Sequence, residues 1–406
     1  MRLHEADLAI HGGPKTRTSP TAPWPRFLPE DIAAATSVLE SGKVNYWTGD
    51  EGRAFEREYA AAVGLPHAIA LANGTVSLEL ALRVLGVGHG DEVVVPSRTF
   101  IATASAVVAV GARPVVADVD RDSGNVTAET IRAAASARTR AVIPVHLGGW
   151  PCEMDAITDL ASERGFAVIE DCAQAHGATH RGKPVGSFGV INSFSFCQDK
   201  IITTGGEGGL LTLRDEATWK RAWAYKDHGK SFDAVYHHEH PPGFRWLHES
   251  WGTNWRMTEM QAAIGRAQLR RLPVWHARRR DNARALLKRL AESPSLRVPD
   301  VPAHAEHAWY RVYAYLRPET LREGWTRDRV AQAIAAEGVP CFSGSCSEIY
   351  REKAFATTAD APRERLPVAR ELGETSLAFL CHPTLDATDM EDTAEAVAKV
   401  LRVAGK

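Results

Sequence analysis

The sequence has almost no net charge, because its 48 lysines and arginines are matched by 50 aspartates and glutamates, for a formal charge of −2. Proteins that bind nucleic acid as their main partner usually carry an excess of positive charge to meet the phosphates. That excess is missing here, and so is an acidic tail that would keep a disordered arm in solution. We therefore predict no nucleic-acid partner, and any anionic ligand must be met by local groups.

Long apolar runs are also missing. The longest, at 102–112, is rich in small residues and much shorter than the roughly 20 apolar residues that cross a bilayer. Residues 1–13 contain Arg2, Glu5 and Asp7 and no apolar centre, unlike a secretory signal. These features predict no membrane partner and a cytoplasmic location.

The six cysteines include no Cys-x-x-Cys pair, so neither a zinc knuckle nor a disulfide framework is indicated. The run His237-His238-Glu239-His240 lacks the helical His-Glu-x-x-His spacing of a metalloprotease, and two prolines follow it directly. A solvated loop is the better interpretation of this run. We predict reduced thiols and no metal site.

The composition, 44% apolar and 24% charged, is that of an ordinary globular protein long enough for two domains. Glycines and prolines concentrate in residues 12–27, which predicts an ordered N-terminal arm over 1–25. One helical pattern runs up to Pro273 and another starts at Trp275, so we place a domain boundary there. The prediction is a large domain at 26–272 and a small domain at 273–406.

Helical patterns alternate with short apolar runs in the large domain, which predicts βαβ units. The apolar runs lack polar alternation, as expected for strands buried on both faces of a mainly parallel sheet. The predicted fold is therefore α/β, with a large mainly parallel-sheet domain and a smaller C-terminal α+β domain. The expected helices are 29–41, 76–85, 102–110, 155–164, 326–337 and 387–403, and the expected strands are 92–95, 114–118, 141–146, 167–171, 191–196, 209–213 and 309–316.

Three groups of residues at strand ends carry the candidate chemistry. Lys200 follows a buried strand and precedes a glycine-rich turn, where burial and a nearby cation would lower its pKa; a solvated loop lysine is the alternative. Asp171 ends another buried strand, where it suits a protonated pyridine nitrogen or simply caps a turn. Residues 73–75, Asn-Gly-Thr, open a helix and suit a phosphate or an ordinary N-cap.

The order of these groups is more specific than any one of them. Residues 73–75 are followed by Phe100, then by Asp171 with Gln174 three residues on, and then by Ser195, Lys200 and the run Glu207-Gly208-Gly209. This order resembles fold-type I pyridoxal-phosphate enzymes and, within them, the DegT/StrS family of sugar aminotransferases. The stretches 170–178 and 252–257 resemble the same family, and the resemblance spans 24–401.

The resemblance implies a cofactor, pyridoxal 5'-phosphate, and a role for each matching residue. Lys200 would hold the cofactor as a Schiff base, Asp171 would pair with its pyridine nitrogen, and Phe100 would stack on its ring. Its partners would be a small-molecule amino donor, L-glutamate or L-glutamine, and a keto-sugar acceptor. For the rest of the cofactor the resemblance implies Gln174 near the hydroxyl group, Gly74, Thr75 and Ser195 at the phosphate, and Asn254 reaching in from the second subunit of a homodimer.

The acceptor is left open by the sequence. Cations alternate with aromatic residues in 225–256, which suits either a nucleotide diphosphate on the acceptor or a dimer contact. The arm at 10–25 instead resembles the branch of the family that acts on cyclitols, including inosose aminotransferases of aminoglycoside pathways. We expect a nucleotide-linked keto-sugar, with a cyclitol such as scyllo-inosose as the alternative and a non-catalytic regulator that binds pyridoxal phosphate as a third reading.

Overall fold

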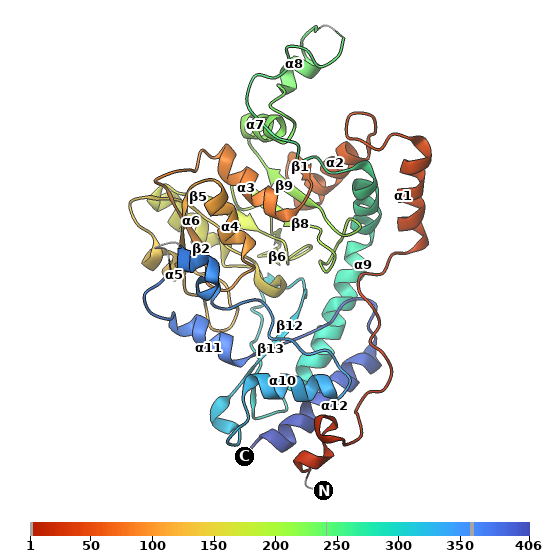
Figure 1. The fold of residues 1–406 in the computed structure, drawn as a ribbon, viewed down its shortest axis with the longest axis vertical. Coiled ribbons are helices and arrows are strands. Elements are labelled where there is room, and N and C mark those ends of the chain that lie inside the picture. Colours follow the sequence, from red (N-terminus) through yellow and green to blue (C-terminus); the bar gives the residue numbers. More distant parts are fainter. Residues whose placement is uncertain (1–2, 241, 358–360) are drawn as a thin grey trace.

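The computed structural model describes residues 3–240, 242–357 and 361–406, and it is built on a seven-stranded sheet (Figure 1). Five neighbouring strands of the sheet, β8, β5, β4, β2 and β3, run parallel. The edge strand β1 pairs antiparallel with β9, which in turn pairs antiparallel with β8. In spatial order the strands are β1 (His67–Leu71), β9 (Gly209–Leu213), β8 (Ile191–Ser195), β5 (Ala167–Asp171), β4 (Thr139–Val142), β2 (Glu92–Pro96) and β3 (Arg113–Ala117).

Every residue of β2, β8 and β9 is buried, including the polar residues Asn192, Ser193 and Ser195 of β8, as expected for strands covered on both faces. Helices cover both faces of the sheet. One face packs against α3, α4 and α7, and the other against α2, α5, α6 and the start of α9. The helices of this domain are α1 (Pro29–Ser41), α2 (Glu51–Val63), α3 (Gly74–Val84), α4 (Ala102–Ala109), α5 (Ala128–Ala134), α6 (Met154–Arg164), α7 (Glu216–Lys226) and α8 (Phe232–Tyr236).

The helix break predicted at Pro273 is wrong. A single helix, α9, runs from Glu259 to Leu290 with Pro273 inside it. The helix packs against α1 and α2 on one side of the proline and against α12 farther along, and this packing outweighs the hydrogen bond that the proline removes. The boundary that we placed at 272/273 therefore falls within one helix that spans both parts of the molecule (Figure 1).

The small domain contains a three-stranded antiparallel sheet in the order β10 (Leu296–Arg297), β12 (Val312–Leu316) and β13 (Ser376–Phe379). The strand predicted at 309–316 starts later than expected, because Trp309 has a φ of 54°, outside the extended region. The strand predicted at 141–146 is β4, which starts at Thr139 and ends at Val142, earlier than expected at both ends. Around the sheet lie α10 (Arg327–Ala336), α11 (Pro367–Thr375) and α12 (Ala387–Ala404).

The N-terminal arm packs on the small domain. Leu8 is fully buried in the core of that domain, and Arg17 pairs with Asp389 and Asp392 of α12 at 2.7 and 3.0 Å. Both termini consequently lie at the same end of the molecule (Figure 1). At the opposite end, the segment that carries α8 projects from the body.

A third, small sheet joins the two domains: β11 (Ala305–Glu306) pairs with β6 (Thr179–His180), which forms a hairpin with β7 (Lys183–Pro184). Among the described residues, no helix combines the length and apolar character needed to span a membrane.

Candidate active site

Lys200 lies in the turn after β8 with its side chain 17% exposed. Its Nζ is 3.4 Å from Oδ1 of Asp199 and 5.2 Å from the ring centre of Tyr310, whose hydroxyl donates a hydrogen bond to Asp199. Burial alone would lower the pKa of Lys200, but Tyr310, Asp199, Cys197 and Asp171 together raise it above the ordinary value. The predicted lowering of this pKa is therefore wrong, because acidic side chains, and not a cation, are the neighbours that act most strongly on the amine.

Asp171 ends β5 and is 6% exposed. Its Oδ1 accepts a hydrogen bond from the amide of Ala173 at 3.1 Å, and its Oδ2 accepts one from the hydroxyl of Thr103 at 3.3 Å. Burial raises the pKa of this carboxyl group, partly offset by these hydrogen bonds and by Lys200. The structure thus brings Asp171 and Lys200 close enough for each to change the pKa of the other.

The helix α3 begins at Gly74, and the side chain of Asn73 caps it by accepting a hydrogen bond from the amide of Val76 at 3.0 Å. A Cβ atom added to Gly74 would lie 2.6 Å from the Cβ of Ser195, so the start of α3 is pressed against the end of β8. Thr75 is exposed at this helix start. The free amides of the first turn, together with the serine hydroxyl, make a cradle for an anion such as a phosphate.

The remaining predicted residues differ in their surroundings. Phe100, just before α4, is 68% exposed. Its carbonyl oxygen accepts a hydrogen bond from the amide of Thr103, the residue whose hydroxyl also donates to Asp171. Gln174 is buried, and its Oε1 accepts a hydrogen bond from the amide of Gly148 at 2.7 Å. Asn254 is exposed, and its backbone pairs with that of Asp227.

Several residues that the sequence reasoning missed also reach this site. Trp24 of the N-terminal arm donates its indole N–H to the carbonyl oxygen of Lys200 at 2.9 Å. Tyr310 and Arg311 of the small domain both approach Asp199. These residues lie more than 100 positions from Lys200 along the chain, and no motif links them to it.

A buried histidine supports the serine of the cradle. Nε2 of His176 donates to the carbonyl oxygen of Ser195 at 2.9 Å, and its Nδ1 lies 2.6 Å from the hydroxyl of Tyr59. Burial lowers the pKa of His176 to about 3, so the ring stays neutral and its Nδ1 accepts a hydrogen bond from the hydroxyl of Tyr59. This bond pattern holds Ser195 in place without adding charge near the cradle.

The residues of the site fit pyridoxal phosphate. A helix-start cradle suits its phosphate, the buried carboxylate of Asp171 suits its ring nitrogen, and the amine of Lys200 suits its aldehyde carbon. When bound, this cofactor supplies an electron sink that stabilises a carbanion next to the amino nitrogen. The fold and the site define an aminotransferase that depends on pyridoxal phosphate.

Comparisons with known proteins identify the family. The model of the DegT/DnrJ/EryC1/StrS aminotransferase family matches residues 26–398. The L-glutamine:2-deoxy-scyllo-inosose aminotransferase of Streptoalloteichus tenebrarius is 35% identical and is aligned over 98% of both chains. The UDP-N-acetyl-3-dehydro-alpha-D-glucosamine 3-aminotransferase of Acidithiobacillus ferrooxidans is 38% identical over 87% of this chain and 88% of its own. This protein belongs to the DegT/DnrJ/EryC1/StrS aminotransferase family.

A solved structure agrees with this assignment. The aminotransferase from Psychrobacter cryohalolentis superimposes with a TM-score of 0.92 at 52% sequence identity, covering 94% of this chain and 99% of that chain. The predicted fold class, with a large mainly parallel sheet and a smaller α+β domain, is confirmed.

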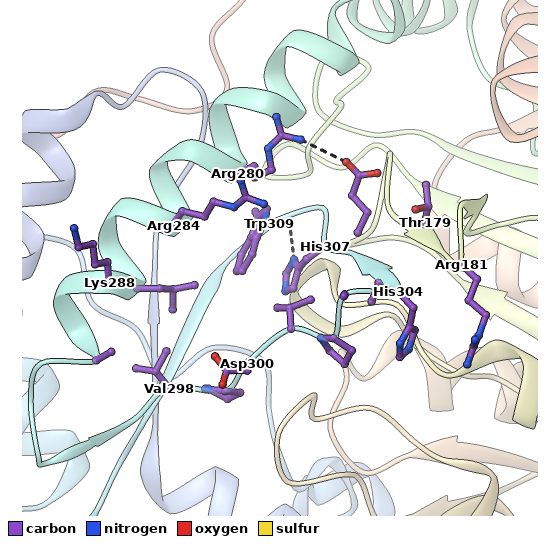
Figure 2. A pocket seen from close by; sticks show the side chains of 18 of the residues that line it. Thr179, Arg181, Arg280, Arg284, Lys288, Val298, Asp300, His304, His307 and Trp309 are labelled. Carbon is purple, nitrogen blue, oxygen red and sulfur yellow. Dashed lines mark hydrogen bonds and ion pairs between the residues drawn. The ribbon is translucent and has the colours of Figure 1, made fainter.

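A cavity of about 830 Å³ lies outside this site, between α9 and the segment 298–309 (Figure 2). Arg280, Arg284 and Lys288 of α9 form one wall, and Arg181 and His304 lie at the far end. None of the predicted site residues lines this cavity.

Proposed function

We propose that this aminotransferase moves an amino group from L-glutamate or L-glutamine to the ketone of a nucleotide-linked sugar in amino-sugar biosynthesis. The observation that carries this proposal is the placement of Lys200 and Asp171 within electrostatic reach of each other, beside the cradle at Gly74 and Ser195. In this role, Lys200 holds the cofactor and Asp171 faces its ring nitrogen. The amides of Gly74 and Thr75 and the hydroxyl of Ser195 hold the phosphate, while Phe100 stacks on the ring and Gln174 lies near its hydroxyl group.

With pyridoxal phosphate bound and an amino donor in the site, the amine of Lys200 would serve as the acid and base of the reaction. It is tethered beside the reacting carbon, so it can take a proton from one atom and return it to another without waiting for a molecule from solution. The neighbouring Asp199 and Tyr310 raise the pKa of Lys200 and so help the amine to take up the proton. The carboxylate of Asp171 would hold the ring nitrogen of the bound cofactor and offset its positive charge.

The segment 225–256 bears on the acceptor. Three of its cations are already used within the chain: Lys226 pairs with Glu56 at 3.1 Å, and Lys230 and Arg256 pair with Asp227 at 2.7 and 2.6 Å. The segment also exposes His228, Arg245, Trp246, His248 and Trp251, with the two indoles 86% and 96% exposed. These groups suit a diphosphate and a nucleobase, and the relative from Acidithiobacillus ferrooxidans is named for a UDP-sugar substrate.

A second candidate acceptor is a free cyclitol. Trp24 of the N-terminal arm bonds to Lys200, and the inosose aminotransferase of Streptoalloteichus tenebrarius is aligned over 98% of this chain. We place this acceptor second, because a cyclitol leaves the exposed cations and indoles of the segment 225–256 without a role in substrate binding.

We further propose that the active unit is a homodimer in which Asn254 reaches the cofactor phosphate of the partner subunit. Asn254 is exposed, and its backbone pairs with that of Asp227, the residue that follows α7 and precedes the segment that carries α8. Trp246 and Trp251 of the same segment are far more exposed than tryptophans of a monomer normally are, as expected for a surface that a second subunit covers.

The acceptor is tested by a two-stage reaction. The bound cofactor is first converted to its aminated form with L-glutamate or L-glutamine, and the donor is removed. One of two acceptors is then added: a keto-sugar linked to UDP or dTDP, or free scyllo-inosose. Return of the original visible spectrum with the nucleotide-linked sugar, together with binding of UDP or dTDP alone, supports the proposal. If only scyllo-inosose returns the cofactor to its original spectrum, the protein is a cyclitol aminotransferase. If the protein binds the cofactor and reacts with neither donor, it is the non-catalytic regulator.

A further inference from the structure

Three metal-binding side chains from separate parts of the chain meet outside the proposed active site. Glu153 directly precedes α6, His180 lies on β6, and His304 directly precedes β11. One ligand atom from each residue lies within 4.8 Å of the others. Figure 2 shows His304 at the end of the cavity away from Lys288, so solvent in the cavity reaches this member of the cluster.

The distances suit a divalent cation after a small adjustment. Nε2 of His304 lies 2.8 Å from Oε1 of Glu153. Ligand atoms around tetrahedral Zn²⁺ are about 3.4 Å apart, given zinc bonds of about 2.0–2.2 Å. The side chains of Glu153 and His304 are 45% and 34% exposed and can turn toward an ion, whereas His180 is fully buried and fixed.

The hydrogen bonds of His180 provide an independent sign of a ligand. Its Nε2 lies 3.2 Å from Oδ2 of Asp155, while its Nδ1 is buried and has no hydrogen-bond partner in the described part of the protein. Asp155 is itself held by Nε of Arg181 at 2.9 Å. Zinc-binding histidines commonly donate one ring N–H to a carboxylate and bind the metal through the other nitrogen, and His180 has this arrangement except for the metal.

We propose that Glu153, His180 through Nδ1, and His304 bind Zn²⁺, with solvent as the fourth ligand. Two histidines and a carboxylate are a common ligand set for this ion. A second group, His146, Glu170 and Cys172, is a poorer candidate. There the carboxylate of Glu170 already accepts three backbone amides and His146, so no lone pair is left for a cation.

The proposed ion stabilises the junction of the two domains. Ala305, the first residue of β11, pairs with His180 across the small sheet, and the carbonyl of His304 accepts the amide of Arg181 at 2.7 Å. The chain runs from there to Tyr310, which contacts Asp199 beside Lys200. Bound zinc therefore adds a cross-link to the segment that brings Tyr310 to the active site, and it raises the unfolding temperature of the protein.

Equilibrium dialysis of the full-length, cofactor-loaded protein against ZnCl₂, followed by metal analysis, tests the proposal. The wild type and a His89→Ala control, which removes an exposed histidine elsewhere, are expected to bind one zinc ion per chain at this site. His304→Ala and Glu153→Gln are expected to bind that ion about tenfold or more weakly. Zinc is also expected to raise the unfolding temperature of the wild type and not that of either variant.

The histidine run at 237–240 could bind zinc separately, so all measurements are repeated with His238→Ala/His240→Ala. Retention of the ion in this variant, with its loss in Glu153→Gln, supports the proposed site even if His304→Ala fails to fold. The proposal is overturned if the wild type binds no zinc, if Glu153→Gln binds it as tightly as the wild type, or if the change at 238 and 240 alone removes it.

Discussion

The amine of Lys200 lies 3.4 Å from a carboxylate oxygen of Asp199, the residue directly before it in the chain. Asp199 also accepts a hydrogen bond from the hydroxyl of Tyr310 in the small domain, and Nη2 of Arg311 lies 3.5 Å away. The charge around Lys200 is therefore set by residues of both domains.

Replacing Asp199 by asparagine removes the negative charge next to Lys200 and leaves its burial unchanged. Because burial favours the neutral amine and Asp199 favours the charged one, the pKa of Lys200 is expected to fall. A reagent that reacts with neutral amines should then modify Lys200 of the cofactor-free variant at lower pH than it modifies Lys200 of the cofactor-free wild type. Peptide mass spectrometry follows the rate of this modification as the pH is changed. The control Asp159→Asn changes an exposed carboxylate elsewhere and should leave the pH dependence of Lys200 modification unchanged. If the pH dependence of Asp199→Asn is also unchanged, or shifts to higher pH, this account is contradicted.

Asp171→Asn should affect stability and reaction in opposite directions. Burial raises the pKa of Asp171 in the folded protein, so above the pKa of the unfolded chain its ionisation costs stability. Without cofactor, the variant should therefore unfold at the same or a higher temperature than the wild type at pH 7–8, and this advantage should disappear in acid. With cofactor, conversion by an amino donor should slow by roughly 100-fold or more in stopped-flow measurements, because the ring nitrogen loses its anionic partner. An unchanged rate would show that Asp171 has no such role.

Gly74→Ala should weaken cofactor binding. The new methyl group would lie 2.6 Å from the Cβ of Ser195 and force the start of α3 away from the end of β8, opening the phosphate cradle. We expect the dissociation constant for pyridoxal phosphate to rise about tenfold, corresponding to about 1.4 kcal/mol. Gly88→Ala is the matched control, since the nearest atom to its added Cβ is 3.7 Å away. Equal affinity of the two variants would place the phosphate elsewhere.

The position of Asn254 is tested by mixing two inactive variants. Lys200→Ala lacks the lysine, and Asn254→Ala lacks the proposed contact to the phosphate of the partner subunit. If Asn254 acts across a dimer, a mixed dimer has one site with both residues intact, and co-refolding should restore activity that neither variant shows alone. No restoration, despite mixed dimers shown by native mass spectrometry, would place Asn254 in the site of its own chain or outside any site.

Local patterns in the sequence predicted much of this architecture. The helix α1 has the predicted bounds, and Lys200, Asp171 and Gly74 lie at strand or helix ends, as their neighbours in the sequence indicate. Such features depend on a few adjacent residues, whose periodicity reports burial directly.

The errors arose where distant contacts decide the outcome. The proline at 273 does not end a helix, because α1, α2 and α12 hold α9 together on both sides of it. The pKa of Lys200 is raised and not lowered, since Tyr310 approaches it from 110 residues away. The contact of Trp24 with Lys200 likewise depends on how the arm packs, which no local pattern encodes.

The visible absorption spectrum of the purified protein with pyridoxal phosphate tests the central claim most directly. The wild type is expected to show the visible band of a cofactor joined to lysine, and L-glutamate or L-glutamine should convert it to the ultraviolet band of the aminated cofactor. Lys200→Ala is expected to lack the lysine-linked band. A wild type without this band, or a Lys200→Ala variant with the same band and the same response to donor, would contradict the assignment of Lys200 and with it the proposed reaction.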